Sequence, residues 1–223
     1  MSNTSLLDRF AALDSAAVSD ALDRLGLPCG AGGIRPVWGP AAVVGFAVTV
    51  ALEPRTEGPA GAHIATTAVE NADDRSVIVV DNQGRTDVSC WGGILSLGAS
   101  LRGVRGVVAD GVCRDVADAR ELGFPVFSRG SIPATARGRL HQRSTGEPVR
   151  VAGLTVEQGD VIVADETGIA VVPQGRAEEV AQIATAVAAR ERAIADEVRA
   201  GAPVSQAMHD ARLAGRSEEE PVR

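Results

Sequence analysis

The sequence predicts an α/β fold in which strands pair in parallel and helices connect them. The first observation is the order strand, helix, strand, helix, strand along residues 76–129, which is typical of parallel α/β folds. The second is that these strand segments are apolar runs rich in valine, as expected for buried strands. The third is an amphipathic segment at 175–201. We therefore expect one α/β domain over residues 1–201 that includes a C-terminal helix at 175–201.

Residues 15–25 are predicted to form the first helix, because apolar residues recur at helical spacing after Ser15, the expected N-cap. The β-branched run at 41–52 predicts a buried strand, and the segment 57–74 is expected to contain a short helix around "HIATTAVEN". An alternating central segment follows. In it we predict strands at 76–81, 104–111 and 124–130, and helices at 91–103 and 113–122.

The C-terminal part is predicted to begin with an extended loop or edge segment, because polar residues and arginines dominate residues 130–150. Residues 154–173 are typical of a β unit with turns at Gln158–Gly159 and Glu166–Gly168. The long helix that follows has one apolar stripe and ends at a glycine. The remaining residues, 202–223, form a polar tail that we expect to be partly disordered.

Composition excludes several classes of function. The formal net charge of −7 disfavours broad binding to nucleic-acid phosphates, so no nucleic-acid partner is expected. No stretch approaches the ~20 apolar residues that cross a bilayer, and the N-terminal residues lack the apolar centre of a signal peptide. We therefore expect a cytoplasmic protein with no membrane partner. The three cysteines include no CxxC pair, which argues against a zinc cage or a disulfide framework.

The chain has no lysine, so all 22 of its basic residues are arginines. This absence excludes a lysine Schiff base, pyridoxal phosphate anchored on lysine, and a Walker-type phosphate loop. If a protein of this composition cleaves carbon–carbon bonds beside a ketone, its electron sink must be a metal or another cofactor.

The stretch "VVADGVCRD" places Asp110, Arg114 and Asp115 just beyond a predicted strand. In open α/β sheets, ligand clefts form at the carboxyl ends of strands. An arginine binds a carboxylate through two parallel hydrogen bonds, and a neighbouring aspartate can hold a divalent cation such as Mg²⁺. Two interpretations stay open. One is a site for a 2-oxo acid and a metal; the other is a first-turn helix acid beside a solvated arginine.

The glycines of "WGGIL" (91–95) precede a predicted helix. Backbone N–H groups at such a position can point at an anion, although simple turn formation is an equally good interpretation. His63, His141 and His209 show no ligand spacing, and we interpret them as structural residues. For Arg139 and Arg143 a solvated loop is the favoured interpretation, and the lining of a site for a polyanionic substrate is the alternative.

Five segments carry a resemblance to a known family: "SDALDRLG", "VVGFAVTV", "WGGIL", "RGVRGVVADGVCRDVADARELGFPVFSRG" and "GDVIVADETGIAVVP". They make the sequence similar to the RraA-like family, which includes 4-hydroxy-4-methyl-2-oxoglutarate (HMG) aldolases and 4-carboxy-4-hydroxy-2-oxoadipate (CHA) aldolases. The resemblance implies a swivelling β/β/α domain with a C-terminal helical extension. It also implies assembly as a homotrimer or homohexamer.

The resemblance assigns roles to single residues. Arg114 and Asp115 would be catalytic, with Arg114 binding the substrate and Asp115 holding a divalent metal, Mg²⁺ or Mn²⁺. Asp118 would support this pair from behind. Backbone donors to the substrate would come from Gly92, Gly93, Ile94 and Leu95. Many relatives have an acid at the position of Gly93. A carboxylate from a neighbouring subunit's C-terminal helix is one expected replacement, with Glu191, Asp196 and Glu197 as candidates.

The implied function is that of a class II, metal-dependent aldolase that cleaves 4-hydroxy-2-oxo acids of the HMG or CHA type to pyruvate. Decarboxylation of oxaloacetate passes through the same enolate, so the same site is expected to support it. The alternative function belongs to another class: a non-catalytic regulator of the RraA type that binds a ribonuclease and inhibits it.

Overall fold

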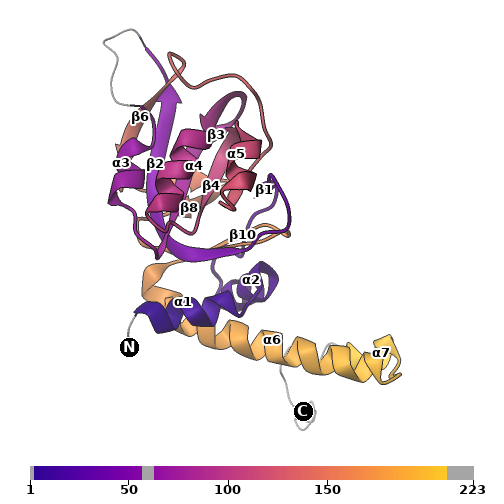
Figure 1. Cartoon of the computed structure of the whole chain (residues 1–223). Coiled ribbons are helices and arrows are strands. Elements are labelled where there is room, and N and C mark those ends of the chain that lie inside the picture. Colours follow the sequence, from indigo (N-terminus) through magenta and orange to yellow (C-terminus); the bar gives the residue numbers. More distant parts are fainter. Residues whose placement is uncertain (1–2, 57–62, 210–223) are drawn as a thin grey trace.

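The computed structural model describes residues 3–56 and 63–209, and it confirms the predicted α/β fold (Figure 1). Its strands are β1 (Arg35–Pro36), β2 (Val43–Pro54), β3 (Ser76–Trp91), β4 (Gly106–Cys113), β5 (Val126–Ser128), β6 (Leu140–Thr145), β7 (Val149–Val151), β8 (Leu154–Val156), β9 (Val161–Ala164) and β10 (Ile169–Val172). The main sheet has the order β1-β5-β4-β3-β2-β9-β10, and β6 also pairs with β2. Strands β2 to β5 pair in parallel, as predicted for the central segment.

The two faces of this sheet are covered by different layers. In β3, Ile78 and Val80 pack in the core beneath a layer of helices, whereas Val77 and Val79 pack in a separate core beneath a second β layer. This separation follows from the alternation of side chains along a strand. The helices of the first layer are α3 (Thr66–Asn71), α4 (Gly93–Leu101) and α5 (Val116–Glu121).

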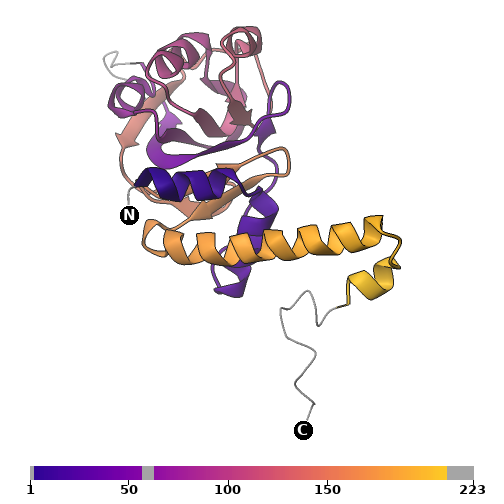
Figure 2. The same ribbon diagram turned by 60° about the horizontal axis from the view of Figure 1, so that its bottom comes forward.

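The second β layer consists of the β7–β8 hairpin and of β9 and β10, because the main sheet curls at this end and packs its last two strands against Val77 and Val79. A third apolar core lies beyond β9 and β10, and three more helices close it (Figure 2). These are α1 (Asn3–Ala11), α2 (Ser15–Arg24) and α6 (Ala177–Arg199), and the short α7 (Val204–Ala207) packs against α6. The arrangement is the β/β/α domain with a C-terminal helical extension that the sequence predicts.

The start of α2 corrects one prediction. Asp14 caps this helix instead of Ser15, because its Oδ1 accepts the N–H of Ala17 at 2.7 Å. The N–H and hydroxyl of Ser15 donate instead to the carboxylate of Asp165, each at 2.7 Å. The turn predicted at Glu166–Gly168 is present, and the carboxylate of Asp165 beside it connects this turn to the start of α2.

Two boundaries in the central segment also differ from prediction. The strand predicted at 76–81 continues to Trp91, with shifts of register against β4 along the way. The helix predicted at 113–122 begins only at Val116, because Cys113 still pairs in β4 and Asp115 has a left-handed backbone. As a result, β3 ends directly before the glycines at 92 and 93, and β4 ends directly before Arg114.

The ends of the chain add elements that were not predicted, whereas the polar stretch 130–150 follows one of its two predicted forms. Helix α1 has no counterpart in the prediction. The stretch 130–150, predicted as an extended loop or edge segment, contains β6, which pairs with β2. The predicted tail at 202–223 includes α7, while residues 210–223 lie outside the described residues. Within residues 3–56 and 63–209, no helix is both long and apolar enough to cross a bilayer.

Candidate active site

The candidate site lies where two neighbouring parallel strands end. Trp91, the last residue of β3, is paired with Cys113, the last residue of β4. The N–H of Arg114 donates to the carbonyl oxygen of Trp91 at 2.9 Å and locks the two chain segments together beyond the sheet. Gly93 and Asp115 therefore lie side by side, although 22 residues separate them in the sequence.

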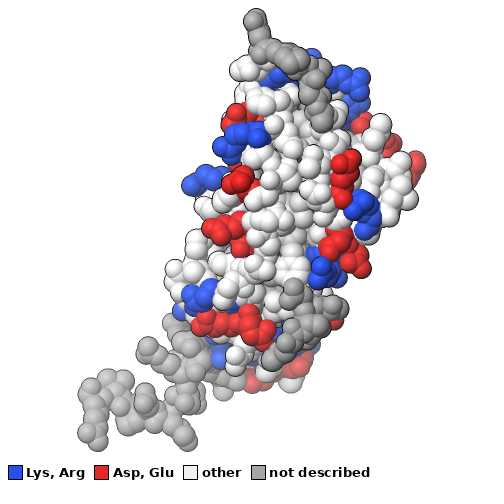
Figure 3. Space-filling view, turned by 90° about the vertical axis from the view of Figure 1, so that its left-hand side faces the viewer, with Lys and Arg blue, Asp and Glu red and all other residues white. Residues whose placement is uncertain are grey.

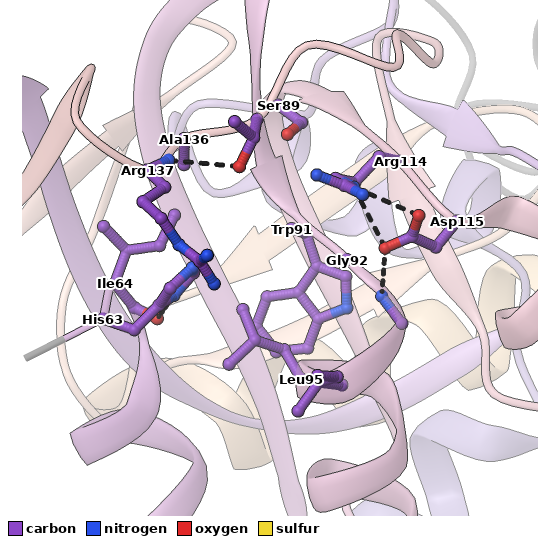
Figure 4. A pocket seen from close by; sticks show the side chains of 13 residues that line it. His63, Ile64, Ser89, Trp91, Gly92, Leu95, Arg114, Asp115, Ala136 and Arg137 are labelled. Atoms are coloured by element: carbon purple, nitrogen blue, oxygen red, sulfur yellow. Dashed lines mark hydrogen bonds and ion pairs between the residues drawn. The ribbon is translucent and has the colours of Figure 1, made fainter.

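A cleft of about 160 Å³ opens at these strand ends (Figure 4). Four parts of the chain line it: residues 63–64, the end of β3 with the first turn of α4, residues 114–115, and residues 135–137. All the residues assigned to substrate or metal by the sequence line this one cleft: Gly92, Gly93, Ile94, Leu95, Arg114 and Asp115. Asp118 lies behind them and is not part of the lining.

Asp115 reaches the cleft through an unusual backbone conformation. Its φ of 56° and ψ of 44° are left-handed, a region that costs energy for most residues and that aspartate tolerates better than many. The carboxylate makes no capping bond to α5, which Asp115 precedes. Instead, its Oδ2 accepts the N–H of Gly93 at 3.0 Å, and both its oxygens lie 3.1 Å from Nε of Arg114. The carboxylate of Asp115 therefore accepts a hydrogen bond from the first turn of α4 and not from its own helix, α5.

These contacts also set the ionisation of Asp115. Burial alone would raise its pKa, but the hydrogen bond from Gly93 and the guanidinium of Arg114 outweigh burial and hold the pKa below its usual value. The side chains of Arg114 and Asp115 remain 38% and 33% exposed, so solvent weakens their attraction and both face the cleft entrance. At neutral pH this corner of the cleft therefore presents an ionised carboxylate beside a fixed cation.

Arg114 keeps most of its hydrogen-bonding capacity for a ligand. Its Nε is engaged by Asp115, whereas its two Nη groups donate to no acceptor within the part of the chain that the structure describes. Figure 4 shows the guanidinium over the cleft, between Ser89 and Asp115. A planar carboxylate is the ligand that such a pair of donors binds best.

The first turn of α4 adds backbone donors. The first four N–H groups of an α-helix have no acceptor within the helix, and in α4 they belong to Gly92, Gly93, Ile94 and Leu95. The N–H of Gly93 donates to Asp115, whereas Ile94 and Leu95 offer theirs at the positive end of the helix. The side chain of Ile94 is 87% exposed, so this residue faces the cleft with its backbone.

The position of Gly93 has no room for a side chain. A Cβ atom there would overlap the carboxylate of Asp118, which projects from the first turn of α5. A Cβ atom on Gly92 would likewise lie 3.0 Å from Oδ2 of Asp115. The two glycines therefore make room for two carboxylates. The sequence identified the missing acid at position 93, and the structure brings Asp118 into the space that its side chain would occupy.

Asp110 does not join Arg114 and Asp115. It lies within β4, only 6% exposed, and its carboxylate pairs with Arg129 and accepts the N–H of Ala152 at 2.7 Å. The prediction placed Asp110 just beyond the strand, whereas β4 continues for three residues past it. Its role is to join the main sheet to the second β layer.

Sequence reasoning missed two polar residues of the cleft. His63 and Arg137 line it, although His63 showed no ligand spacing and Arg137 was one arginine in a polar segment. The two arginines considered earlier lie elsewhere. Nη1 of Arg139 donates to the carbonyl oxygen of Thr135 at 2.9 Å, and Nε of Arg143 lies 3.3 Å from Glu53. No signal in the sequence separates Arg137 from its neighbours.

The donor set suits a hard divalent cation that keeps most of its waters. Among the described residues, no group of three or more acids, histidines and cysteines gathers to form a protein-only metal cage. Magnesium, however, often takes one or two carboxylates and completes its shell with water. Asp115, with Asp118 behind Gly93, meets that requirement. Residues Glu191, Asp196 and Glu197 belong to α6, on the other side of the sheet, so they do not reach this cleft within one chain (Figure 2).

Most of the chain matches one known protein family. The family described as RraA-like, Aldolase/RraA, matches residues 15–171, a span that includes both strand ends and the whole lining of the cleft. The chain belongs to the RraA-like family. The α/β architecture and the cleft described above are thus those of an RraA-like protein.

Individual relatives differ in length and in name. The chain is 32% identical over 92% of its length to Protein DlpA of Legionella pneumophila, and it spans only 33% of that longer protein. It is 33% identical, over 87% of its length and 90% of the relative, to a Halalkalibacterium halodurans protein provisionally named a 4-hydroxy-4-methyl-2-oxoglutarate aldolase. The solved structure of Streptomyces coelicolor RraAS2, described as an unusual member of the RNase ES inhibitor RraA family, matches with a TM-score of 0.79 and 26% identity, covering 89% of this chain and all of RraAS2.

Proposed function

We propose that this RraA-like protein is a divalent-metal-dependent (class II) lyase that cleaves 4-hydroxy-2-oxo acids of the HMG or CHA type to pyruvate. The observation that carries the proposal is that Arg114, Asp115 and the first turn of α4 face one cleft. Together they supply what a 2-oxo acid needs: donors for its carboxylate, and positive charge where an enolate develops. The name of the Halalkalibacterium relative supports the same reaction class.

Each residue has a definite task in this proposal. The Nη groups of Arg114 bind the substrate carboxylate, and the N–H groups of Ile94 and Leu95 orient it. Asp115, kept ionised by its neighbours, holds Mg²⁺ or Mn²⁺. When bound, the metal supplies Lewis acidity at the 2-oxo group.

The chemistry then follows from the charge that this corner stabilises. In retro-aldol cleavage the 4-hydroxyl group gives its proton to solvent water, a C=O bond forms at C4, and the C3–C4 bond breaks. Its electron pair remains on the pyruvoyl unit as an enolate, which takes a proton from water at C3 to give pyruvate. Loss of CO₂ from oxaloacetate leaves the same enolate, so we propose decarboxylation as a second reaction of the site. In both reactions Arg114 and the amides of α4 stabilise the negative charge that develops.

Asp118 supports the site without touching the substrate. Its carboxylate occupies the space that a side chain at position 93 would fill, directly behind the glycine loop. A second negative charge at this place strengthens the attraction of Asp115 for a divalent cation. We therefore assign Asp118 a supporting role in metal affinity, and no direct role in substrate binding.

The test is turnover with the metal supplied. The protein is incubated with Mg²⁺ or Mn²⁺ and either 4-hydroxy-4-methyl-2-oxoglutarate or oxaloacetate, and pyruvate is measured. Asp115→Asn is expected to lower kcat/KM by about 100-fold or more, because the loss of a metal-holding charge removes several kcal/mol of transition-state stabilisation. Glu121→Gln, an exposed acid at the end of α5, the helix that Asp115 precedes, is the matched control. Consumption of neither substrate, or full activity of Asp115→Asn, contradicts the proposal.

The alternative function is that of a protein that binds and inhibits a ribonuclease. It is favoured by the structural similarity to RraAS2, whose description places it in a family of ribonuclease inhibitors. The two functions separate cleanly in an experiment. Tight association with a purified RNase E-type enzyme, together with no metal-dependent release of pyruvate, would favour the regulator over the lyase.

We also propose that the protein acts as a homotrimer or homohexamer. Three large apolar side chains lie exposed along one face of α4, at the spacing of successive helical turns: Ile94, Leu97 and Leu101, which are 87%, 44% and 80% exposed. Clustered apolar residues of this kind mark protein–protein contacts more often than scattered ones. Because α4 also opens the cleft, a neighbouring subunit on this face would border the site.

A further inference from the structure

The cleft has two ends of different chemistry. Arg114 and Asp115 form one end, where the proposed metal and 2-oxo group lie. Figure 4 shows Arg137 and His63 on the opposite side of the cleft, across from Arg114. Apolar side chains also line the cleft, among them those of Ile64, Leu95 and Ala136. The cleft therefore offers a cation at each end of a partly apolar passage.

The guanidinium of Arg137 stands apart from those of its neighbours. Within the described residues it makes no hydrogen bond or ion pair with protein, whereas Arg139 and Arg143 are both engaged. The Arg137 backbone is nevertheless held, because its N–H donates to Oγ1 of Thr135 at 3.2 Å. The exposed side chain is thus attached to a fixed point on the rim and keeps its donors available.

The charges around Arg137 point to a ligand with two anionic groups. Among the described lining residues, the only acid is Asp115, which lies at the other end and is already paired with Arg114. Nδ1 of His63 lies 3.3 Å from the carbonyl oxygen of Ile64, so this ring lies beside the Arg137 end and brings no negative charge to it. Arg137 has no acidic partner within the described part of the chain, and the cleft already holds Arg114 for one carboxylate. The planar, positively charged guanidinium of Arg137 therefore suits a second carboxylate in geometry and charge.

We propose that Arg137, with His63 beside it, forms a second anion subsite, and that Arg137 is the residue that binds the carboxylate which acids of the HMG or CHA type carry at the end remote from the keto group. This inference rests on the proposed function, because it takes the Arg114 end as the site of the 2-oxo group. It assigns Arg137 to substrate selection and leaves the bond-breaking chemistry to the other end of the cleft.

The test compares two ligands that differ only at the remote end. 2-Oxoglutarate and 2-oxopentanoate have the same number of carbons and lack the 4-hydroxyl group that aldol cleavage requires, so binding is measured without turnover. Affinities are determined by calorimetry on the full chain with Mg²⁺ or Mn²⁺ present, and pyruvate serves as the probe of the Arg114 end. The wild-type protein is expected to prefer 2-oxoglutarate by about tenfold, the size of one charge-assisted hydrogen-bonded pair at a part-exposed site.

Variants assign that preference to a residue. Arg137→Gln is expected to remove it while leaving the affinity for pyruvate within about twofold, and Arg137→Lys to keep part of it, because the charge remains but the planar fork is lost. Arg143→Gln, from the same arginine-rich segment but outside the cleft, is the control and should change neither affinity. The side chain of Arg137 is exposed, so these substitutions are not expected to disturb folding.

The outcomes separate this inference from the function on which it rests. If pyruvate binds but the wild type does not prefer 2-oxoglutarate, or if Arg137→Gln retains that preference, the second subsite is wrong and the proposed function stands. If neither pyruvate nor either longer acid binds with metal present, the proposed function fails and this inference fails with it. A preference lost in Arg137→Gln and kept in Arg143→Gln supports the assignment.

Discussion

At the scale of single residues, the site depends on the crowding of two carboxylates against two glycines. The left-handed backbone of Asp115 directs its carboxylate to the N–H of Gly93, and Asp118 fills the space behind that glycine. A Cβ atom at position 93 would overlap the carboxylate of Asp118, and one at position 92 would press more lightly on that of Asp115. The glycines are therefore required by close approach, and not by a positive φ, which neither of them has.

The exclusion at position 93 gives the first prediction. Gly93→Ala is expected to lower the free energy of unfolding by about 1–3 kcal/mol, because the added methyl group overlaps Asp118. Gly98→Ala is the matched control on the same helix. There the new Cβ meets only Val69, at an ordinary 3.4 Å, and replacing a mid-helix glycine should stabilise by about 0.5–1 kcal/mol.

Urea unfolding of both variants measures whether stability falls at position 93 and rises at position 98. The double variant Gly93→Ala with Asp118→Ala tests whether overlap with Asp118 is the cause of the loss. Removing the Asp118 carboxylate should recover most of the lost stability, because the two side chains then no longer compete for one space. Equal stabilisation by alanine at positions 93 and 98 would refute the exclusion.

At the scale of elements, the termini of helices are held by acids that come from other segments. Asp115, in the loop before α5, accepts an N–H from the start of α4. Asp165, in the turn between β9 and β10, accepts an N–H from the start of α2. Each contact joins segments that are distant in sequence, 22 residues apart for α4 and 150 for α2. Satisfying the first N–H groups of a helix thus also fixes the place of that helix in the fold.

The Asp165 contact gives the second prediction, which includes a pH dependence. Burial raises the pKa of Asp165, but hydrogen bonds from Ser15, Thr167 and Gly168 outweigh it and leave the pKa lowered in the folded state. A lowered folded pKa contributes stability above the unfolded value of about 3.9 and loses it as the pH falls through the folded value.

Asp165→Asn is therefore expected to destabilise the protein by about 1–2 kcal/mol at pH 7, through the weakened cap of α2. The difference from wild type should shrink as the pH is lowered below 4. Urea unfolding of both proteins at several pH values measures it, with Glu166→Gln from the same turn as the control. A difference that stays constant down to pH 2 would contradict an ionised cap.

At the scale of the whole molecule, two of the apolar cores lie on one side of the main sheet and the candidate site lies on the other. The second apolar core joins β9 and β10 to the central strands, and the third joins them to α1, α2 and α6. Helices α3, α4 and α5 lie on the opposite side of the sheet (Figures 1 and 2), and the cleft is lined by the start of α4 and by residues that precede α3 and α5. Acidic and basic residues alternate around an uncharged band on the face in Figure 3, so neither sign of charge dominates that face. The exposed stripe of α4 lies next to the cleft, where a partner subunit would influence the site.

The stripe gives the prediction at this scale. Leu101→Glu is expected to reduce the size of the assembly, because an 80% exposed leucine buried by a partner subunit would become a charge in that contact. Light scattering after size-exclusion chromatography measures the mass, and circular dichroism verifies the fold. Leu122→Glu, at the end of α5, is the control. An unchanged mass for Leu101→Glu would remove α4 from the interface.

Much of the fold and most of the site follow from the sequence, because they depend on local pattern. Apolar runs rich in valine predict the strands, and the long stripe after residue 175 predicts α6. The motifs "WGGIL" and "VCRD" identify residues that all line one cleft, because each follows a strand, and parallel neighbours end at the same edge of a sheet. Asp110 is the exception, since an apolar run does not say where a strand ends.

What only the tertiary structure decides is which distant residues meet. The sequence by itself determines the α/β layering, the absence of lysine chemistry and the two halves of the site around Gly93 and Asp115. It does not reveal that Asp118 fills the space beside Gly93, or that Arg137 stands across the cleft from Arg114. Those contacts depend on how α5 and the loop before β6 pack against the strand ends. Such packing follows from the sum of many weak contacts over the whole chain and leaves no periodic signal at the residues concerned.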